Sequence, residues 1–180
     1  LIQLSDMSGN SNHGILNGFM LNGVTSNFLL NNDITFSTNC LAPYEVKMLI
    51  QGYYNGGGTM VPLLYNSGLS NQTTMTDYVT VEFHQHVAPY ALVYSTSAYV
   101  MNNGSISLFI PISLVGGSKY IVVKHQNTLE TWSKNPVNLT SAGTYNFTNA
   151  ASKAHGDNMV EVESGKWAFF SGDINQDKTI

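Results

Sequence analysis

The stretch Val79-Thr-Val-Glu-Phe-His84 alternates apolar and polar side chains at every step. Successive side chains of a β-strand point to opposite faces, so this alternation predicts a strand that buries one face and exposes the other. The same pattern occurs at 46–50 and at 105–110. The run Tyr120-Ile-Val-Val-Lys124 is more continuously apolar, which predicts a central strand that is covered on both faces.

Turn-forming residues separate these segments from one another and from several weaker ones. Glycine, asparagine and serine cluster at 56–58, 102–104, 116–117 and 164–165. Further short strand candidates are 90–100, 144–147, 159–162 and 166–170. About seven to nine short strands with this punctuation predict an all-β fold, an antiparallel β-sandwich over residues 43–171. One short helix is expected at 148–155, between a cap at Asn149 and a stop at Gly156.

Residues 1–42 differ in kind from the rest of the chain. They carry isolated charges, Asp6 and Asp33, among apolar patches such as 14–21 and 27–30 that asparagine and glycine interrupt. They could supply extra strands of the sandwich, the remnant of an upstream domain, or an arm. An arm with exposed strand patches would pair with other copies or modules of the parent protein by strand addition.

The composition excludes several classes of protein. Charged residues make up 10% of the 180 residues and the net charge is −4, which argues against nucleic acid as a partner. No apolar run approaches the roughly 18 residues that span a bilayer, so we expect no membrane insertion. Cys40 is the only cysteine, which rules out a disulfide within this sequence. A surface rich in neutral polar residues is typical of secreted bacterial β-proteins, and we expect a secreted or cell-surface location.

The last nine residues, Gly172-Asp-Ile-Asn-Gln-Asp-Lys-Thr-Ile180, contain the opening of a calcium loop. Asp173, Asn175 and Asp177 have the spacing of positions 1, 3 and 5, which supply side-chain oxygens to the cation. The segment 172–180 resembles a truncated first repeat of a dockerin. Lys178 stands where such loops normally have glycine, and a solvated tail is the alternative. We therefore expect calcium to bind weakly if it binds.

From Tyr44 to the end, the order of motifs resembles a module of large multidomain proteins secreted by Bacteroidota, often through the type IX system. The motifs that carry the resemblance lie at 46–58, 79–82, 120–125, 129–133, 150–154 and 171–177. The chain departs from the usual pattern at 84–86 and at Gln126. The resemblance implies a non-catalytic module that precedes a dockerin-like loop, and it implies no particular ligand.

His84 and His86 are two residues apart on a predicted strand, which would place both imidazoles on one face. Two such rings could hold a divalent metal if His125 or Glu82 supplied a third ligand. The alternative is a pair of solvent-facing histidines at the end of a strand, since Pro89 follows closely. The metal site is therefore a hypothesis that depends on where the strand ends.

The sequence contains no motif of a catalytic nucleophile or of a phosphate-binding loop. The Gly-x-Ser-x-Gly pattern is absent, and the glycines at 56–58 are not followed by Lys-Ser or Lys-Thr. Glu161 and Glu163 alternate with valines, which is the pattern of a solvated strand face rather than of paired catalytic carboxylates. We therefore predict that the protein is not an enzyme.

The aromatic residues are the remaining functional signal in the sequence. Tyr53 and Tyr54 lie beside glycines, and Trp132 lies among polar neighbours, so these rings are candidates for an exposed platform on which a sugar ring packs. Glu130 and Gln126 could bind the sugar hydroxyls. Against this, tryptophan in a β-sandwich often fills the core. The predicted function is binding of a polysaccharide or cell-surface glycan, and the alternative is a structural or adhesive module.

Overall fold

The computed structural model describes residues 2–4, 14–16, 41–175 and 177. The chain divides into two units, Leu1–Thr38 and Asn39–Ile180. In the first unit, strands β1 (Ile2–Leu4) and β2 (Gly14–Leu16) pair in antiparallel fashion. The second unit is an all-β fold built of two main sheets, as the sequence predicts, and it carries every residue considered below.

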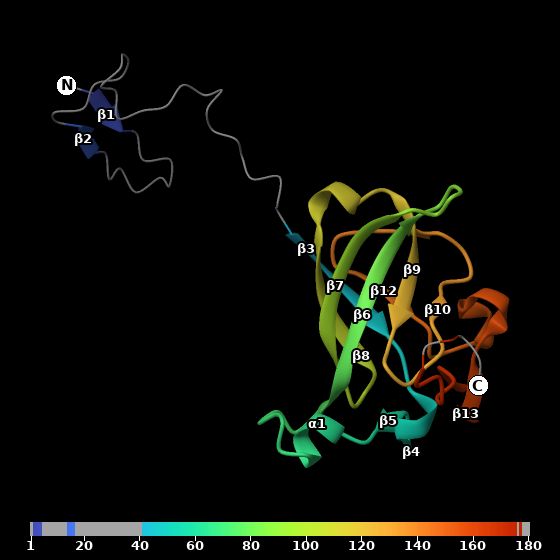
Figure 1. Cartoon of the computed structure of the whole chain (residues 1–180). Helices are drawn as coiled ribbons and strands as arrows, with labels where there is room; N and C mark the ends of the chain where they lie inside the picture. The colour runs from blue at the N-terminus through green and yellow to red at the C-terminus, as the bar shows by residue number, and fades with distance from the viewer. Residues whose placement is uncertain (1, 5–13, 17–40, 176, 178–180) are drawn as a thin grey trace. The chain divides into compact units, whose positions relative to one another are not determined.

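The larger sheet has five strands and is built around the alternating segment. They are β6 (Met75–Gln85), β7 (Leu92–Met101), β9 (Ser118–Lys124), β10 (Thr131–Trp132) and β11 (Val137–Asn138). β6 pairs with β7 on one side and β9 on the other, and β9 also pairs with β10 and β11. All of these pairings are antiparallel, and Figure 1 shows the three long strands side by side.

The smaller sheet has the order β12, β3, β8. β3 (Leu41–Lys47) begins two residues before the predicted start of the sandwich, and it pairs antiparallel with β8 (Ser105–Pro111). β12 (Gly143–Asn146) runs parallel to β3, whereas the other pairings between the described strands of the two sheets are antiparallel. The two sheets together hold eight strands.

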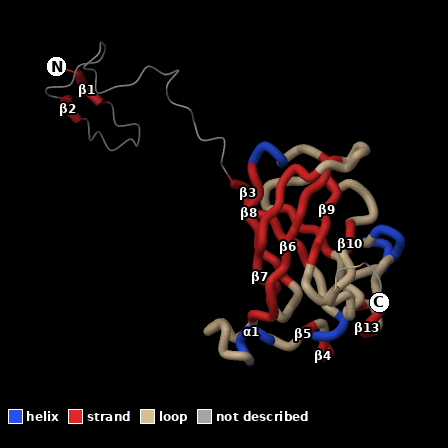
Figure 2. Tube along the Cα trace, in the orientation of Figure 1, coloured by secondary structure: helices blue, strands red, loops and turns tan. Residues whose placement is uncertain are grey.

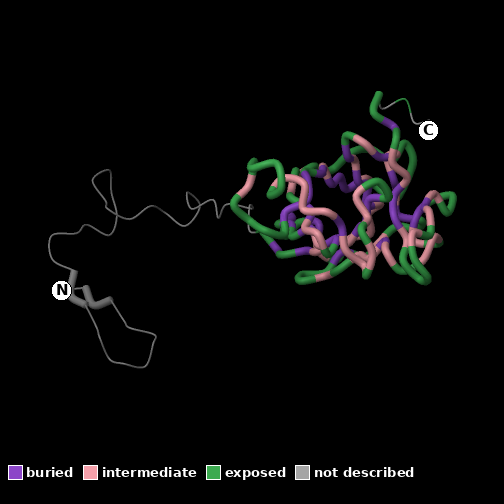
Figure 3. The backbone as a smooth tube through the Cα atoms, turned by 90° about the horizontal axis from the view of Figure 1, so that it is seen from below, coloured by how far each residue is buried: buried purple, intermediate pink, exposed green. Residues whose placement is uncertain are grey.

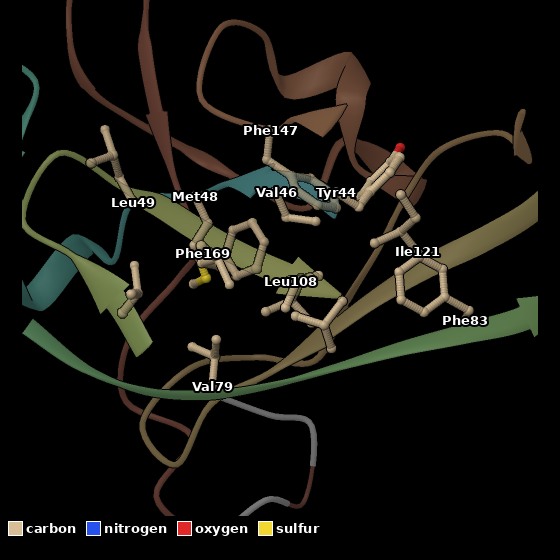
Figure 4. Packing of buried hydrophobic residues seen from close by; sticks show 14 of the residues in the cluster. Tyr44, Val46, Met48, Leu49, Val79, Phe83, Leu108, Ile121, Phe147 and Phe169 are labelled. Carbon is tan, nitrogen blue, oxygen red and sulfur yellow. The ribbon is translucent and has the colours of Figure 1, made fainter. Parts of the chain in front are cut away.

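The apolar halves of the alternating segments form the core between the sheets. Val79, Val81 and Phe83 of β6 are at most 2% exposed, and the inward residues of β3 and β8 are at most 4% exposed. Figure 4 shows Tyr44 of the small sheet close to Phe83 of the large one, and their ring centroids are 6.2 Å apart in an edge-to-face arrangement. Full burial of each such side chain contributes about 1.5–3 kcal/mol to stability, so contacts of this kind help to hold the two sheets together.

Short elements close the ends of the sandwich, and Figure 2 shows helical segments as minor pieces beside the strands. They are η2 (Gln51–Tyr53), β4 (Tyr54–Gly56), β5 (Thr59–Met60), α1 (Leu63–Asn66), η3 (Ile112–Leu114), η4 (Ala151–Lys153), η5 (His155–Asp157), β13 (Val160–Glu163) and β14 (Lys166–Ala168). Buried, intermediate and exposed positions are interleaved along the second unit (Figure 3). Among the described residues, none of the helices has the length and apolar content that a membrane crossing needs.

The short α-helix does not lie at 148–155, where the sequence predicted it. The chain there forms two separate 3-10 turns, η4 and η5. The side-chain oxygen of Asn146 accepts hydrogen bonds from the backbone N–H and the hydroxyl of Thr148, both at 2.8 Å. Such a local bond competes with helix formation, and Ala150 that follows is fully extended. Gly156, the expected stop, has a φ of 67° inside the second turn.

Candidate functional site

The candidate site lies on the face of the five-stranded sheet that points away from the core. On β6 this face carries Thr80, Glu82 and His84, the polar half of the alternating segment. The register with β9 places Lys124 opposite Thr80, and Tyr120 opposite His84. The sequence pattern therefore determines which side chains of β6 lie on the outer face, while strand pairing determines which neighbours flank them.

A carboxylate at the centre of this face is held by two nitrogen groups. Lys124 Nζ lies 3.0 Å from Glu82 Oε1, and His84 Nε2 lies 2.9 Å from Glu82 Oε2. Lys124 also approaches Glu130 at 3.8 Å. Burial favours a raised pKa for Glu82, but the hydrogen bonds from Lys124 and His84 outweigh burial and the pKa is lowered. The carboxylate is consequently ionised at neutral pH.

Aromatic rings surround a cavity next to this carboxylate. Trp132 lies with its ring centroid 4.7 Å from that of His84 and 5.9 Å from that of Tyr120. Tyr90 meets Tyr120 edge to face at 5.8 Å. Tyr90, Tyr120, Trp132 and His155 line a cavity of about 300 Å³. The rings are inclined to one another by 60° and 86°, so they form the walls of a pocket rather than one flat row.

Trp132 and Glu130, both predicted from the sequence, do come together at this pocket. The indole Nε1–H of Trp132 donates to Glu130 Oε1 at 2.6 Å. The two residues are two positions apart at the start of β10, so their side chains share a face. Trp132 is only half-buried and does not fill the space between the sheets. The hydrogen bond fixes the orientation of the ring against the cavity.

Tyr53 and Gln126 lie together around a different carboxylate, that of Asp77. The Tyr53 hydroxyl donates to Asp77 Oδ2 at 3.1 Å, and Gln126 Nε2 donates to the same oxygen at 3.4 Å. His125 Nε2 is 3.1 Å from this oxygen, and the backbone N–H of Asn127 donates to His125 Nδ1. Burial lowers the pKa of His125, and the Asp77 carboxylate only partly opposes this effect. His125 is therefore neutral, with its proton on Nε2.

Tyr54 has a third set of partners. Its hydroxyl donates to Glu163 of β13 and accepts the backbone N–H of Gly58 at 2.8 Å. This pair of bonds fastens the turn between β4 and β5 to β13. Within the described residues, no ring contact joins Trp132 to either tyrosine, so the structure does not gather the three predicted platform rings into one row.

The predicted histidine pair is divided by the end of its strand. β6 ends at Gln85, and its pairing with β7 shifts between Phe83 and His84. Both ring nitrogens of His84 are used, by Glu82 and by the carbonyl of Tyr90 at 2.8 Å, while His86 Nδ1 lies 3.2 Å from the carbonyl of Ser118. In the part of the chain that is described, no three His, Cys, Asp or Glu side chains form a metal-holding group.

The predicted calcium segment begins with a turn that its own side chains stabilise. The backbone N–H of Asp177 donates to Asp173 Oδ1 at 3.0 Å, and Asn175 Nδ2 donates to Asp177 Oδ2 at 2.7 Å. Asp173 is 1% exposed. These bonds bring the three predicted oxygen donors close together. Residues 176 and 178–180 lie outside the described residues, and calcium binding stays a prediction.

Several residues of this outer face and its pocket carry no sequence pattern that predicts their place there. Tyr120 looks like one end of a buried strand, and Lys124 like the other, yet both point to the outer face. Tyr90 reaches the pocket from the segment between β6 and β7, and His155 reaches it from η5, far away in the chain. A search of the strand alternation could have found Lys124 and Tyr120 only if the pairing of β6 with β9 had been known.

Comparison with models of known protein families finds no match for this chain, and comparison with curated protein sequences finds none either. The resemblance to secreted Bacteroidota modules therefore stays a prediction. The functional argument depends on the geometry of the outer face alone.

Proposed function

We propose that the unit Asn39–Ile180 is a non-catalytic module of a larger secreted or cell-surface protein, and that it binds a polysaccharide or cell-surface glycan. The observation that supports this best is the pocket of Tyr90, Tyr120 and Trp132 beside an ordered group of charged side chains. Aromatic rings offer apolar faces to the C–H groups of a sugar ring, and the charged side chains offer hydrogen bonds to its hydroxyls.

The charged groups are fixed before a ligand arrives. Glu82 is bonded to Lys124 and His84, and Glu130 is bonded to Trp132. A carboxylate that is already ordered loses little conformational entropy when it accepts a hydroxyl, so binding costs less. This arrangement favours recognition of a polar, uncharged ligand rich in hydroxyl groups.

The same network favours binding over glycoside hydrolysis. A hydrolase needs one carboxyl group whose pKa is raised, because that group must donate a proton to the leaving oxygen. The pKa of Glu82 is instead lowered, because hydrogen bonds from Lys124 and His84 outweigh burial. Lys124 Nζ stands between Glu82 and Glu130, 2.9 Å from a carboxylate oxygen of the first and 3.8 Å from one of the second. We therefore assign both carboxylates to hydrogen bonding.

Affinity electrophoresis in gels that contain mixed-linkage β-glucan, xyloglucan, xylan or galactomannan tests this proposal. We expect at least one polysaccharide to retard the protein, and Trp132→Ala to weaken that interaction by roughly 1–3 kcal/mol, the range found for bases that stack on aromatic rings. Trp132→Phe keeps an aromatic face and should retain part of the affinity.

Tyr65→Ala is the matched control, because Tyr65 is a 42% exposed tyrosine on α1, outside the cavity walls. Retardation should be unchanged in this variant. A folded Trp132→Ala protein that is retarded as strongly as the original would refute the assignment of the pocket. If none of the four polysaccharides retards the protein, the proposal that it binds one of them is refuted.

A second candidate function, a structural or adhesive module that assembles by strand addition through its N-terminal arm, has one observation in its favour. β7 is the last strand of its sheet, and among the described residues it has a strand neighbour on one side only. Leu92 and Val93 at its start are 53% and 39% exposed. An edge strand of this kind is a template for an added strand.

A further inference from the structure

A second pair of aromatic rings lies on the outer face of the sheet, at the other end of β6. Tyr78 of β6 is directly opposite Tyr99 of β7, and their ring centroids are 4.0 Å apart. Tyr78 is 50% exposed and Tyr99 is 37% exposed. Neither ring belongs to the core, so burial between the sheets does not account for two tyrosines at these positions.

A cavity lies between Tyr78 and the middle of the sheet. Its volume is about 440 Å³, and Thr80, Ser97, Lys124 and Gln126 are among its other lining residues. Thr80 and Ser97 stand opposite each other, and their hydroxyl oxygens are 3.3 Å apart. Hydroxyl groups in this position offer both donors and acceptors to a ligand that lies across the strands.

Lys124 belongs to both halves of the face. It lines the cavity beside Tyr78, and it also bonds Glu82 and approaches Glu130, which holds Trp132. The polar side chains therefore form a continuous path from the tyrosine pair to the Trp132 pocket. Tyr78 and His84 are six positions apart on one strand, which is about 20 Å, or the length of on the order of four linked sugar rings.

We propose that Tyr78 and Tyr99 form a second aromatic subsite, and that the ligand is an extended chain of about four or more sugar rings lying along β6. This inference depends on the proposed carbohydrate binding and specifies its mode. The site binds an interior segment of a polysaccharide through two aromatic subsites, the tyrosine pair and the Trp132 pocket. Between them, Thr80, Ser97 and Lys124 form hydrogen bonds with the sugar. A single terminal sugar would use the Trp132 pocket alone.

The charges of the face define the class of polysaccharide. Within the described part of this face, Glu82 and Glu130 supply two carboxylates against the one ammonium group of Lys124, and the largely buried Asp77 lines the cavity beside Tyr78. Asp77 is bonded to the neutral His125, so the face retains an excess of negative charge. A uronic acid or a sulfated sugar would be repelled, while a neutral or amino-bearing glycan would not. The chain should therefore bind neutral polysaccharides and reject polygalacturonate and alginate.

Calorimetry with oligosaccharides of two to six units, cut from the neutral polysaccharide that retards the full chain, tests the length of the site. We expect affinity to increase up to about four units, the length set by the strand, and then to level off. Tyr78→Ala should weaken binding of the hexasaccharide roughly 5- to 100-fold and leave disaccharide binding unchanged. Trp132→Ala should weaken both, and Tyr65→Ala neither.

Tyr99→Ala provides a second variant if Tyr78→Ala does not fold, because both rings belong to the same subsite. Equal affinity for the disaccharide and the hexasaccharide would overturn the extended site while leaving carbohydrate binding intact. Unchanged hexasaccharide affinity in both folded tyrosine variants would overturn it as well. Failure of the unmodified protein to bind any neutral polysaccharide would overturn both proposals, and retention by polygalacturonate would overturn the assignment of ligand class.

Discussion

The buried carboxylate of Asp77 forms hydrogen bonds with several segments of the chain. Its Oδ1 accepts the backbone N–H of Tyr78 at 2.7 Å, and its Oδ2 accepts bonds from Tyr53, His125 and Gln126. These partners come from η2, from β6 and from the segment after β9. Loss of the carboxylate would leave several donors unsatisfied at once, which costs more than the net value of any one bond.

The His125 ring links this cluster to pH. Its pKa is lowered in the folded protein because burial outweighs the attraction of Asp77, so the unfolded chain binds the proton more readily. The contribution of His125 to folding stability should therefore be constant above the ordinary histidine pKa of 6.5. It should fall as the pH decreases from there towards the lower folded pKa. His125→Gln keeps a donor for Asp77 but does not titrate, and its stability should change less over this range.

Urea denaturation at several pH values from 7.5 to about 5 measures the effect as the slope of the unfolding free energy with pH. His86→Gln is the matched control, because His86 is exposed. If the slopes of the original protein and His125→Gln are the same, the titration of His125 does not contribute to stability.

At the scale of single elements, the alternating segments predicted the strands well. The segments 79–84 and 105–110 lie within β6 and β8. Once one face of a strand is buried, the alternation determines which side chains point to the core. The run 120–124 lies in β9, and its three central residues are fully buried. The segment 46–50 covers only the end of β3 and the buried residues that follow.

The parts that could not be predicted depend on contacts between distant residues. Trp132 and Glu130 are neighbours in the sequence, and both were recognised. Tyr90 and Tyr120 join them only through strand pairing and a loop, which no local pattern encodes. Tyr53 carries a promising local signal beside the glycines, but its hydroxyl is used by Asp77.

The turn between β7 and β8 provides a test at this scale. Gly104 has a φ of 83°, and a Cβ added there would lie 2.4 Å from the carbonyl oxygen of Met48. Gly104→Ala should therefore destabilise the fold by about 2 kcal/mol or more, from the strained backbone and the displaced Met48 carbonyl together. The drop in unfolding free energy on urea denaturation measures this loss.

Gly57→Ala is the control, because Gly57 also has a positive φ, 61°, but an added Cβ would meet nothing within 4 Å. It should cost only the backbone strain, about 1–2 kcal/mol. Equal losses in the two variants would mean that contact with Met48 contributes nothing.

At the scale of the whole molecule, the division into two units can be tested by removing the first unit. The described core, the pocket and the tyrosine pair all belong to Asn39–Ile180. A protein of residues 39–180 alone should therefore unfold cooperatively, with a midpoint close to that of the full chain, in thermal circular dichroism. It should also keep its affinity for the retained polysaccharide.

Sedimentation velocity of the same two proteins separates the two candidate functions. If the N-terminal residues assemble the protein by strand addition, the full chain should associate with increasing concentration while the shorter protein stays monomeric. Identical sedimentation of both would count against assembly through these residues. A shorter protein without cooperative unfolding would show that the division into two units is wrong.

The parallel pairing of β3 with β12 also has a consequence for how this chain acquires its structure in time. The hydroxyl of Thr144 donates to the carboxylate of Glu45, although the two residues are 99 positions apart in the sequence. Tyr44 pairs with Gly143 across the same separation. The entropy of closing so long a loop must be offset before these contacts form, which makes folding slow. Until residue 146 is available, β3 lacks one of its two neighbours. A partly synthesised chain therefore exposes an unfinished sheet, and the sandwich becomes complete only near the end of synthesis.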